Sequence, residues 1–158
     1  MRAQLDDRLR TLGIELRVHT HKAAPTCTVH EAELANWDIK GVPLVNLFVR
    51  AKKNQQLFLI CTPAERKVSL MSFQRDIMKY SRANMIRFAP EETMYPTLKG
   101  CQLRERGTEH IALARATEYK VHPGCATPLA AMFADEKLTV VIDKAIMDSE
   151  QLVMVHPL

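Results

Sequence analysis

The chain has 158 residues, of which 47% are hydrophobic and 25% charged, with a formal net charge of +4 at pH 7. These values are ordinary for one folded domain of about 100–200 residues and exclude a largely disordered chain. No segment has the ~18 consecutive apolar residues that span a membrane, and charges run through residues 1–12 where a signal peptide would be apolar. We therefore expect a single soluble domain over residues 1–158.

The N-terminal quarter predicts a helix, a strand and a second helix. Leucines at helical spacing favour a short helix over Asp6–Leu12, which Gly13 ends. The alternating segment Glu15–His19 predicts a strand. The capping box Thr28–Glu31 predicts a helix that continues to about Trp37.

A β-hairpin is expected next. Val42–Arg50 is apolar and β-branched, and Gln56–Thr62 is a second apolar run. The polar segment Lys52–Gln55 between them is typical of a turn.

Three further elements follow the hairpin. Ser69 can cap a helix whose apolar face consists of Phe73, Ile77 and Tyr80. Met85–Ala89 predicts a strand, and Pro90 stands where a proline opens the first turn of a helix.

The C-terminal part contains three strand-like runs, at Leu129–Phe133, Leu138–Asp143 and Leu152–His156. The pattern over Pro96–Val121 is weak, and Glu109–Tyr119 is compatible with either a helix or a strand.

The cysteines indicate a reduced protein. Cys27, Cys61, Cys101 and Cys125 are widely separated and form no CxxC pair. We expect free thiols and a cytoplasmic location rather than a disulfide framework.

Three histidines are candidate metal ligands. His19 and His21 fall on one face of a predicted strand, and His30 could be a third ligand. An HxH pair is a weak signal, and no carboxylate or cysteine lies near it at ligand spacing. We expect neither a metal nor a cofactor.

Three motifs carry the functional signal. The first joins Thr28–Ala32 to Val45–Lys53, the second is the GxxxP loop Gly124–Pro128, and the third is Val140–Lys144 with the closing Val155–Leu158. In this order, over about residues 15–158, they resemble the YbaK/ProX family of aminoacyl-tRNA editing deacylases. The nearest branch is the alanyl-tRNA(Pro) deacylases, which include domains associated with prolyl-tRNA synthetase.

The resemblance implies an α/β (α+β) fold, a curved mixed β-sheet flanked by helices. It also implies hydrolysis of the ester between a small amino acid and a mischarged tRNA, most plausibly Ala-tRNA(Pro). The implied mechanism is attack by water in a pocket between the strand at 42–50 and the backbone-lined loop at 124–128, whose fixed amides would stabilise the oxyanion. The residues expected to act in catalysis are Gly124, Thr127 and Asn46. Those expected to bind the substrate are Val45, Cys125, Ala126, Pro128 and His156.

The sequence departs from the family at Val45, where the family has a lysine. Valine cannot supply a charge-assisted contact, worth about 1.5–3 kcal/mol. Another cation such as Lys22 or Lys40 could replace it, the substrate could differ, or the domain could bind without cleaving. A longer segment precedes the GxxxP loop, and the chain stops at Leu158, where the family continues. We expect either a pocket that is incomplete at its floor or a sequence that is one domain of a longer protein.

Basic residues suggest where tRNA would bind. Five of them lie around the hairpin and the turn after it, and could contact the phosphates of the acceptor end: Arg50, Lys52, Lys53, Arg66 and Lys67. A solvated hairpin tip would have the same composition. An aminoacyl-tRNA synthetase is a further expected partner, and no membrane contact is expected. The alternatives to an enzyme are a non-catalytic module of the same fold that binds tRNA or a synthetase complex, and a regulatory domain for a free amino acid or nucleotide.

Overall fold

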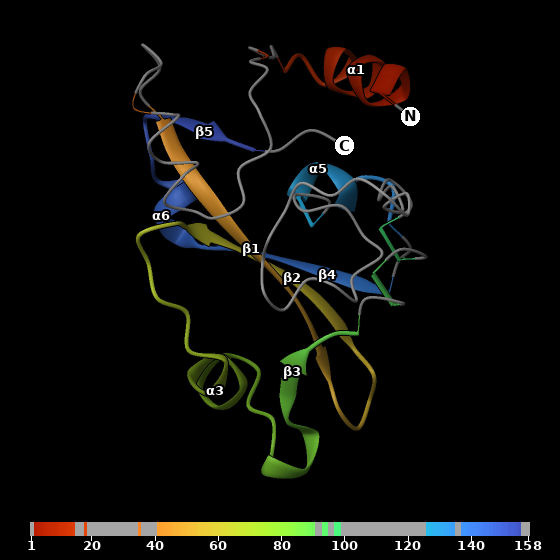
Figure 1. Cartoon of the computed structure of the whole chain (residues 1–158), viewed down its shortest axis with the longest axis vertical. Coiled ribbons are helices and arrows are strands. Elements are labelled where there is room, and N and C mark those ends of the chain that lie inside the picture. Colours follow the sequence, from red (N-terminus) through yellow and green to blue (C-terminus); the bar gives the residue numbers. More distant parts are fainter. Residues whose placement is uncertain are drawn as a thin grey trace, which may run out of the picture.

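The structure is a computed structural model that describes residues 2–14, 18, 35, 41–90, 93–94, 97–98, 126–134 and 137–155. Its centre is an open, mixed β-sheet flanked by helices (Figure 1). The five strands are β1 (Gly41–Ala51), β2 (Leu57–Pro63), β3 (Ile86–Phe88), β4 (Leu138–Ile142) and β5 (Leu152–Met154). The expected fold class, a mixed sheet with flanking helices, is confirmed.

The long strand β1 organises the sheet. It pairs with β2 and β3 in antiparallel fashion and with β5 in parallel fashion. The strand order is β3-β1-β2-β4, because β4 pairs in parallel with the other side of β2. The predicted hairpin is confirmed by its continuous register, from Leu44 opposite Pro63 to Arg50 opposite Leu57.

Short helices surround the sheet. They are α1 (Arg2–Thr11), α3 (Leu70–Ser72), the π-helical turn η1 (Phe73–Ile77), the 3-10 turn η2 (Arg82–Asn84), α5 (Pro128–Ala131) and α6 (Lys144–Met147). The first helix begins before the predicted Asp6 and ends where Gly13 takes a φ of +69°, a conformation that glycine adopts without strain. Within the described ranges, no helix combines the length and apolar character needed to cross a membrane.

The sheet separates two hydrophobic cores because successive strand side chains point to opposite faces. The first core contains Phe48, Leu57, Leu59 and Cys61 from the hairpin, together with Leu98 and with Ala130 of α5. The second core contains Val49, Ala51, Phe58 and Ile60, together with Phe73 and Ile86. Helix α5 therefore covers one face of the sheet, and α3 with η1 covers the other (Figure 1).

The prediction of a strand at Leu129–Phe133 is wrong, because this segment begins with helix α5. Thr127 caps that helix, its Oγ1 accepting from the Leu129 amide at 3.4 Å, and Pro128 occupies the first turn. A capping threonine, an N-terminal proline and two alanines all favour a helix. The strand was predicted from the apolar residues of Leu129–Phe133, a pattern that a short buried helix shares.

The helix predicted after Ser69 is also different in detail. Ser69 does cap it, accepting from the Ser72 amide at 3.2 Å, but the helix widens at once into η1. In a π turn the bond joins residues five apart, and Met78 N donates to Phe73 O at 3.0 Å. Met78 therefore packs on the second core, whereas Ile77 is 65% exposed rather than part of an apolar face.

The remaining strand predictions agree with the structure within one or two residues. β3 lies inside Met85–Ala89, and β5 lies inside Leu152–His156. β4 ends one residue before Asp143, which caps α6 instead. Apart from residues 18 and 35, the elements predicted at Glu15–His19 and Thr28–Trp37 lie outside the described residues, as does the weak segment at 99–121.

Candidate functional site

Strand β1 sends its two central candidate residues to opposite faces of the sheet. Its register with β2 is unbroken from residue 44 to residue 50, so the alternation of side chains holds throughout. Asn46 shares a face with Phe48 of the first core, and Val45 shares a face with Val49 of the second core. Val45 and Asn46 are consecutive in the sequence, but they face different cores.

Asn46 lies on the face that α5 covers. Its cross-strand partner is Cys61, which is 1% exposed. The Asn46 side-chain oxygen, Oδ1, is buried and accepts no hydrogen bond from any group in the described part of the chain. A buried amide oxygen without a donor loses about 1–3 kcal/mol relative to one that is satisfied. It is therefore an acceptor available to a ligand that brings its own donor.

The thiol next to Asn46 is not a nucleophile in this environment. Burial raises the pKa of Cys61 from its ordinary 9.0 to about 11. Since the thiolate is the reactive form, Cys61 stays protonated and inert at neutral pH. It acts as a small apolar residue of the first core.

The second half of the predicted loop reaches the same face. Ala126 packs against the first core, and Thr127, the cap of α5, is fully buried. Pro128 begins α5, which contacts β2 and β4. The structure therefore brings Asn46 and the segment Ala126–Pro128 to one face of the sheet.

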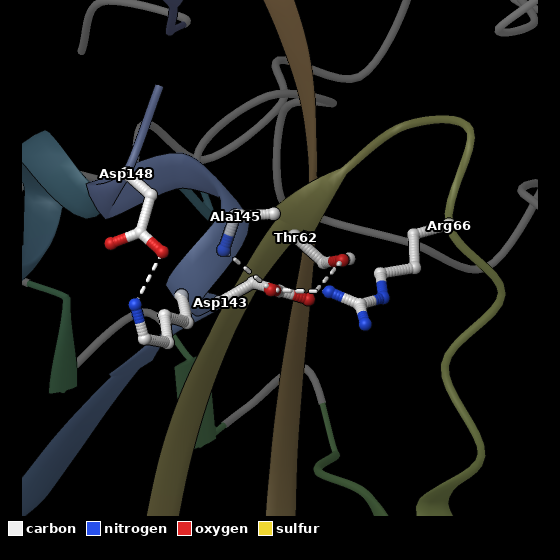
Figure 2. A network of polar contacts seen from close by, with 6 residues as sticks. Thr62, Arg66, Asp143, Ala145 and Asp148 are labelled. Atoms are coloured by element: carbon white, nitrogen blue, oxygen red, sulfur yellow. Dashed lines mark hydrogen bonds and ion pairs between the residues drawn. The ribbon is translucent and has the colours of Figure 1, made fainter. Parts of the chain in front are cut away.

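A polar network occupies the Val45 face (Figure 2). Thr62, the cross-strand partner of Val45, is 1% exposed and donates to Asp143 Oδ2 at 3.3 Å. Asp143 Oδ1 accepts from Arg66 Nη1 at 2.5 Å and from the Ala145 amide at 3.0 Å. Asp143 thus caps α6 and ties it to β2, and it holds the Arg66 guanidinium on the same face of the sheet as Val45.

The five predicted tRNA-binding residues fall into two groups. Lys52 and Lys53 are exposed in the hairpin turn, and Arg50 precedes them at the end of β1. Arg66 and Lys67 follow β2, at the far end of a seven-residue strand that spans about 20 Å. Arg66 is also paired with Asp143. The structure brings the first three together and keeps the last two apart from them.

Two residues of this geometry were missed in the sequence reading. Asp143 was placed at the end of a strand, although an aspartate before Lys-Ala-Ile-Met is a helix-cap signal. Arg87 lies directly opposite Arg50 across β1 and β3, and this pairing has no local signal.

Gly124, Cys125 and His156 lie outside the described residues, as do Lys22 and Lys40 and the three histidines considered for a metal. Within the part of the chain that is described, the His, Cys, Asp and Glu side chains form no group of three or more that could hold a metal ion.

Comparisons with known proteins give a consistent result. The family model for the aminoacyl-tRNA editing domain matches residues 21–158. The chain is 28% identical over 159 residues to the prolyl-tRNA synthetase associated domain-containing protein 1 of Bos taurus, covering 100% of this chain and 78% of that protein. It is 27% identical to the protein of the same name from Mus musculus, covering 100% of this chain and 79% of that protein. A protein from Homo sapiens, named as putative, is 27% identical over 157 residues, covering 99% of this chain and 78% of the relative.

Proposed function

The chain belongs to the aminoacyl-tRNA editing domain family, and we propose that it hydrolyses the ester between a small amino acid and a mischarged tRNA. The family has an editing role, and the names of the relatives connect them with prolyl-tRNA synthetase. We take alanyl-tRNA(Pro) as the first candidate substrate, with the acceptor end of the tRNA as the bound segment and a synthetase as a further partner.

The unpaired oxygen of Asn46 is the observation that carries this proposal. An aminoacyl ester has an α-ammonium group and a free ribose hydroxyl, and both are hydrogen-bond donors close to the scissile bond. Asn46 Oδ1 is a buried acceptor that no described group satisfies. A hydrogen bond to a charged donor is worth about 1.5–3 kcal/mol, enough to fix the amino acid relative to the attacking water.

Direct attack by water is favoured over a covalent intermediate. The Cys61 thiol beside Asn46 is held protonated by burial, which raises its pKa to about 11. The Thr127 hydroxyl on the same face accepts the Leu129 amide as a helix cap. In the proposed reaction the loop at Gly124–Pro128 supplies backbone amides to the oxyanion.

The test is hydrolysis of labelled Ala-tRNA(Pro) by the wild-type protein and by Asn46→Ala. Wild-type protein should cleave the ester faster than buffer, and Asn46→Ala should reduce kcat/KM by about 10- to 100-fold, the equivalent of one charge-assisted hydrogen bond. Asn46→Asp keeps an acceptor oxygen and should retain more activity than Asn46→Ala. Gln151→Ala truncates an exposed amide before β5 and serves as the control. Ester hydrolysis at the buffer rate for every small aminoacyl-tRNA would refute the proposal.

A second candidate, a binding module without catalysis, is motivated by Val45. The family lysine is absent there, and the cation joined to that face, Arg66, is already bound to Asp143. Assaying Val45→Lys beside the wild type separates the two. If the wild type cleaves, the family activity does not need the lysine. If only Val45→Lys cleaves, the natural chain is a binder with an intact site.

A further inference from the structure

One end of the sheet carries a concentration of unpaired positive charge, which we call the basic tip: Arg50, Lys52, Lys53, Arg82 and Arg87. In Figure 1 it is the end where the β1–β2 turn and β3 lie side by side. Between residues 41 and 90 the sequence contains two acidic residues, Glu65 and Asp76. Asp76 is paired with Arg75 at 2.6 Å, and Glu65 follows β2 at the other end of the strand. Among the described residues, no member of the basic tip forms an ion pair.

Two of these charges face each other across the sheet. Arg50 and Arg87 are directly opposite partners in the antiparallel pair of β1 and β3. The Cβ atoms of such partners are about 4.5–5.5 Å apart, and like charges at this distance destabilise the pairing. A protein gains nothing in folding from this arrangement, but an anion between the two guanidiniums would relieve it.

The backbone that carries the two lysines is held in place. Asn84, which is 8% exposed, accepts through Oδ1 from the Lys53 amide at 2.7 Å and from the Asn54 amide at 3.2 Å. Lys52 N donates to Met85 O at 2.9 Å. The turn is therefore fastened to the segment that carries Arg82, so the lysines project from a fixed base rather than from a loose hairpin end.

The two arginines of the basic tip lie on the same face of the sheet as Asn46. Arg50 lies four residues after Asn46 on β1, and Arg87 alternates with the second-core residue Ile86, so both arginines are on the first-core face. Four strand residues span about 13 Å. A stacked nucleic-acid strand rises about 3.4 Å per nucleotide, so this distance corresponds to about four nucleotides.

We propose that the basic tip binds the phosphate backbone of tRNA a few nucleotides from the aminoacyl end held at Asn46. This inference rests on the proposed function for the position of the ester, and it assigns a phosphate path to Arg50, Arg87 and the two lysines. Arg66 and Lys67 are not part of that path, because they follow the opposite end of β2.

Binding of uncharged, labelled tRNA at several salt concentrations tests the inference without any chemistry. Arg50→Gln, Arg87→Gln and Lys53→Gln should each weaken binding by at least about threefold and lower the slope of log K against log salt by about one. Arg75→Gln is the matched control, because Arg75 is exposed but already paired with Asp76. Arg66→Gln should also behave like the wild type. Neither arginine variant at the strand pair should lower the melting temperature, since each removes a repulsion.

The outcomes separate this inference from the proposed function. If the tip variants raise the KM for aminoacyl-tRNA at unchanged kcat, both are supported. If wild-type protein cleaves the ester and the tip variants bind tRNA as it does, the phosphate path is wrong and the activity stands. If tRNA binds through the tip but no ester is cleaved, the path stands and the proposed activity fails. Absence of tRNA binding, or equal competition by poly-glutamate, would overturn the inference.

Discussion

Asp143 joins three parts of the fold through one carboxylate, and its removal should be the most damaging single polar substitution on this side of the sheet. Its carboxylate accepts hydrogen bonds from the Ala145 amide in the first turn of α6, from the Thr62 hydroxyl and from the Arg66 guanidinium. The three contacts contribute different amounts to the free energy of unfolding because their partners differ in solvent exposure. We predict that Asp143→Ala destabilises the protein through the first two contacts and hardly at all through the third.

The magnitude follows from the surroundings of each partner. Loss of a helix cap costs about 0.5–2 kcal/mol. The Thr62 hydroxyl is 1% exposed, and a buried hydroxyl left without its acceptor costs about 1–3 kcal/mol. The side chain of Arg66 is 57% exposed, so its ion pair contributes about 0–1 kcal/mol. Asp143→Ala should therefore lower the free energy of unfolding by about 1.5–6 kcal/mol, most of it from the first two contacts.

Urea unfolding followed by circular dichroism measures this change. Asp143→Asn keeps one oxygen for the helix cap, and its Nδ2 replaces Oδ2 and can donate to the Thr62 hydroxyl, which also accepts. This variant should therefore lose about 1 kcal/mol or less. Asp148→Ala removes the exposed contact with Lys144 on the same helix and should fall within about 0.5 kcal/mol of the wild type. Equal losses for Asp143→Ala and Asp143→Asn would show that charge, rather than capping and the buried hydroxyl, carries the effect, and would refute the reasoning.

Three further predictions concern the cores and the sheet. Burial raises the pKa of Cys61 from 9.0 to about 11, so the folded protein keeps this thiol protonated more strongly than the unfolded chain does. The contribution of the neutral thiol to the free energy of unfolding is complete below pH 9 and is lost as the pH rises from 9 to 11. Up to about 2–3 kcal/mol of unfolding free energy should disappear over that range, and a loss of the same size in Cys61→Ala would contradict this. A Cβ at Gly41 would lie 2.9 Å from Leu152 O, so Gly41→Ala should lose about 1–3 kcal/mol in urea unfolding; unchanged stability would exclude this close approach of β1 and β5. Phe73→Ala should lose about 3–5 kcal/mol, whereas Ile77→Ala, at 65% exposure, should change the melting temperature little; similar losses would contradict the π-helical turn.

Much of the candidate site depends on contacts that no local pattern contains. Thr62 and Asp143 are separated by 81 residues and Arg66 and Asp143 by 77, so the network of Figure 2 has no sequence signature beyond the capping aspartate. Likewise, Arg87 lies opposite Arg50 because β3 pairs with β1. Arg66 lies far from Arg50, Lys52 and Lys53 because the extended strand β2 separates it from the hairpin turn. Asn46 and the loop residue Thr127 were both expected at the site, but the face that they share could not be derived without the register.

The sequence by itself determined the elements whose signals are local and periodic. The apolar runs on either side of Lys52–Gln55 predicted the hairpin, Ser69 predicted a helix start, and the ordered motifs indicated the editing-domain family. The tertiary structure alone decided that Val45 and Asn46 face different cores and that Arg50 and Arg87 lie opposite each other. The physical reason is that period and capping act within a few residues, whereas the face of a strand and the partner of a charge are set by the pairing of distant segments.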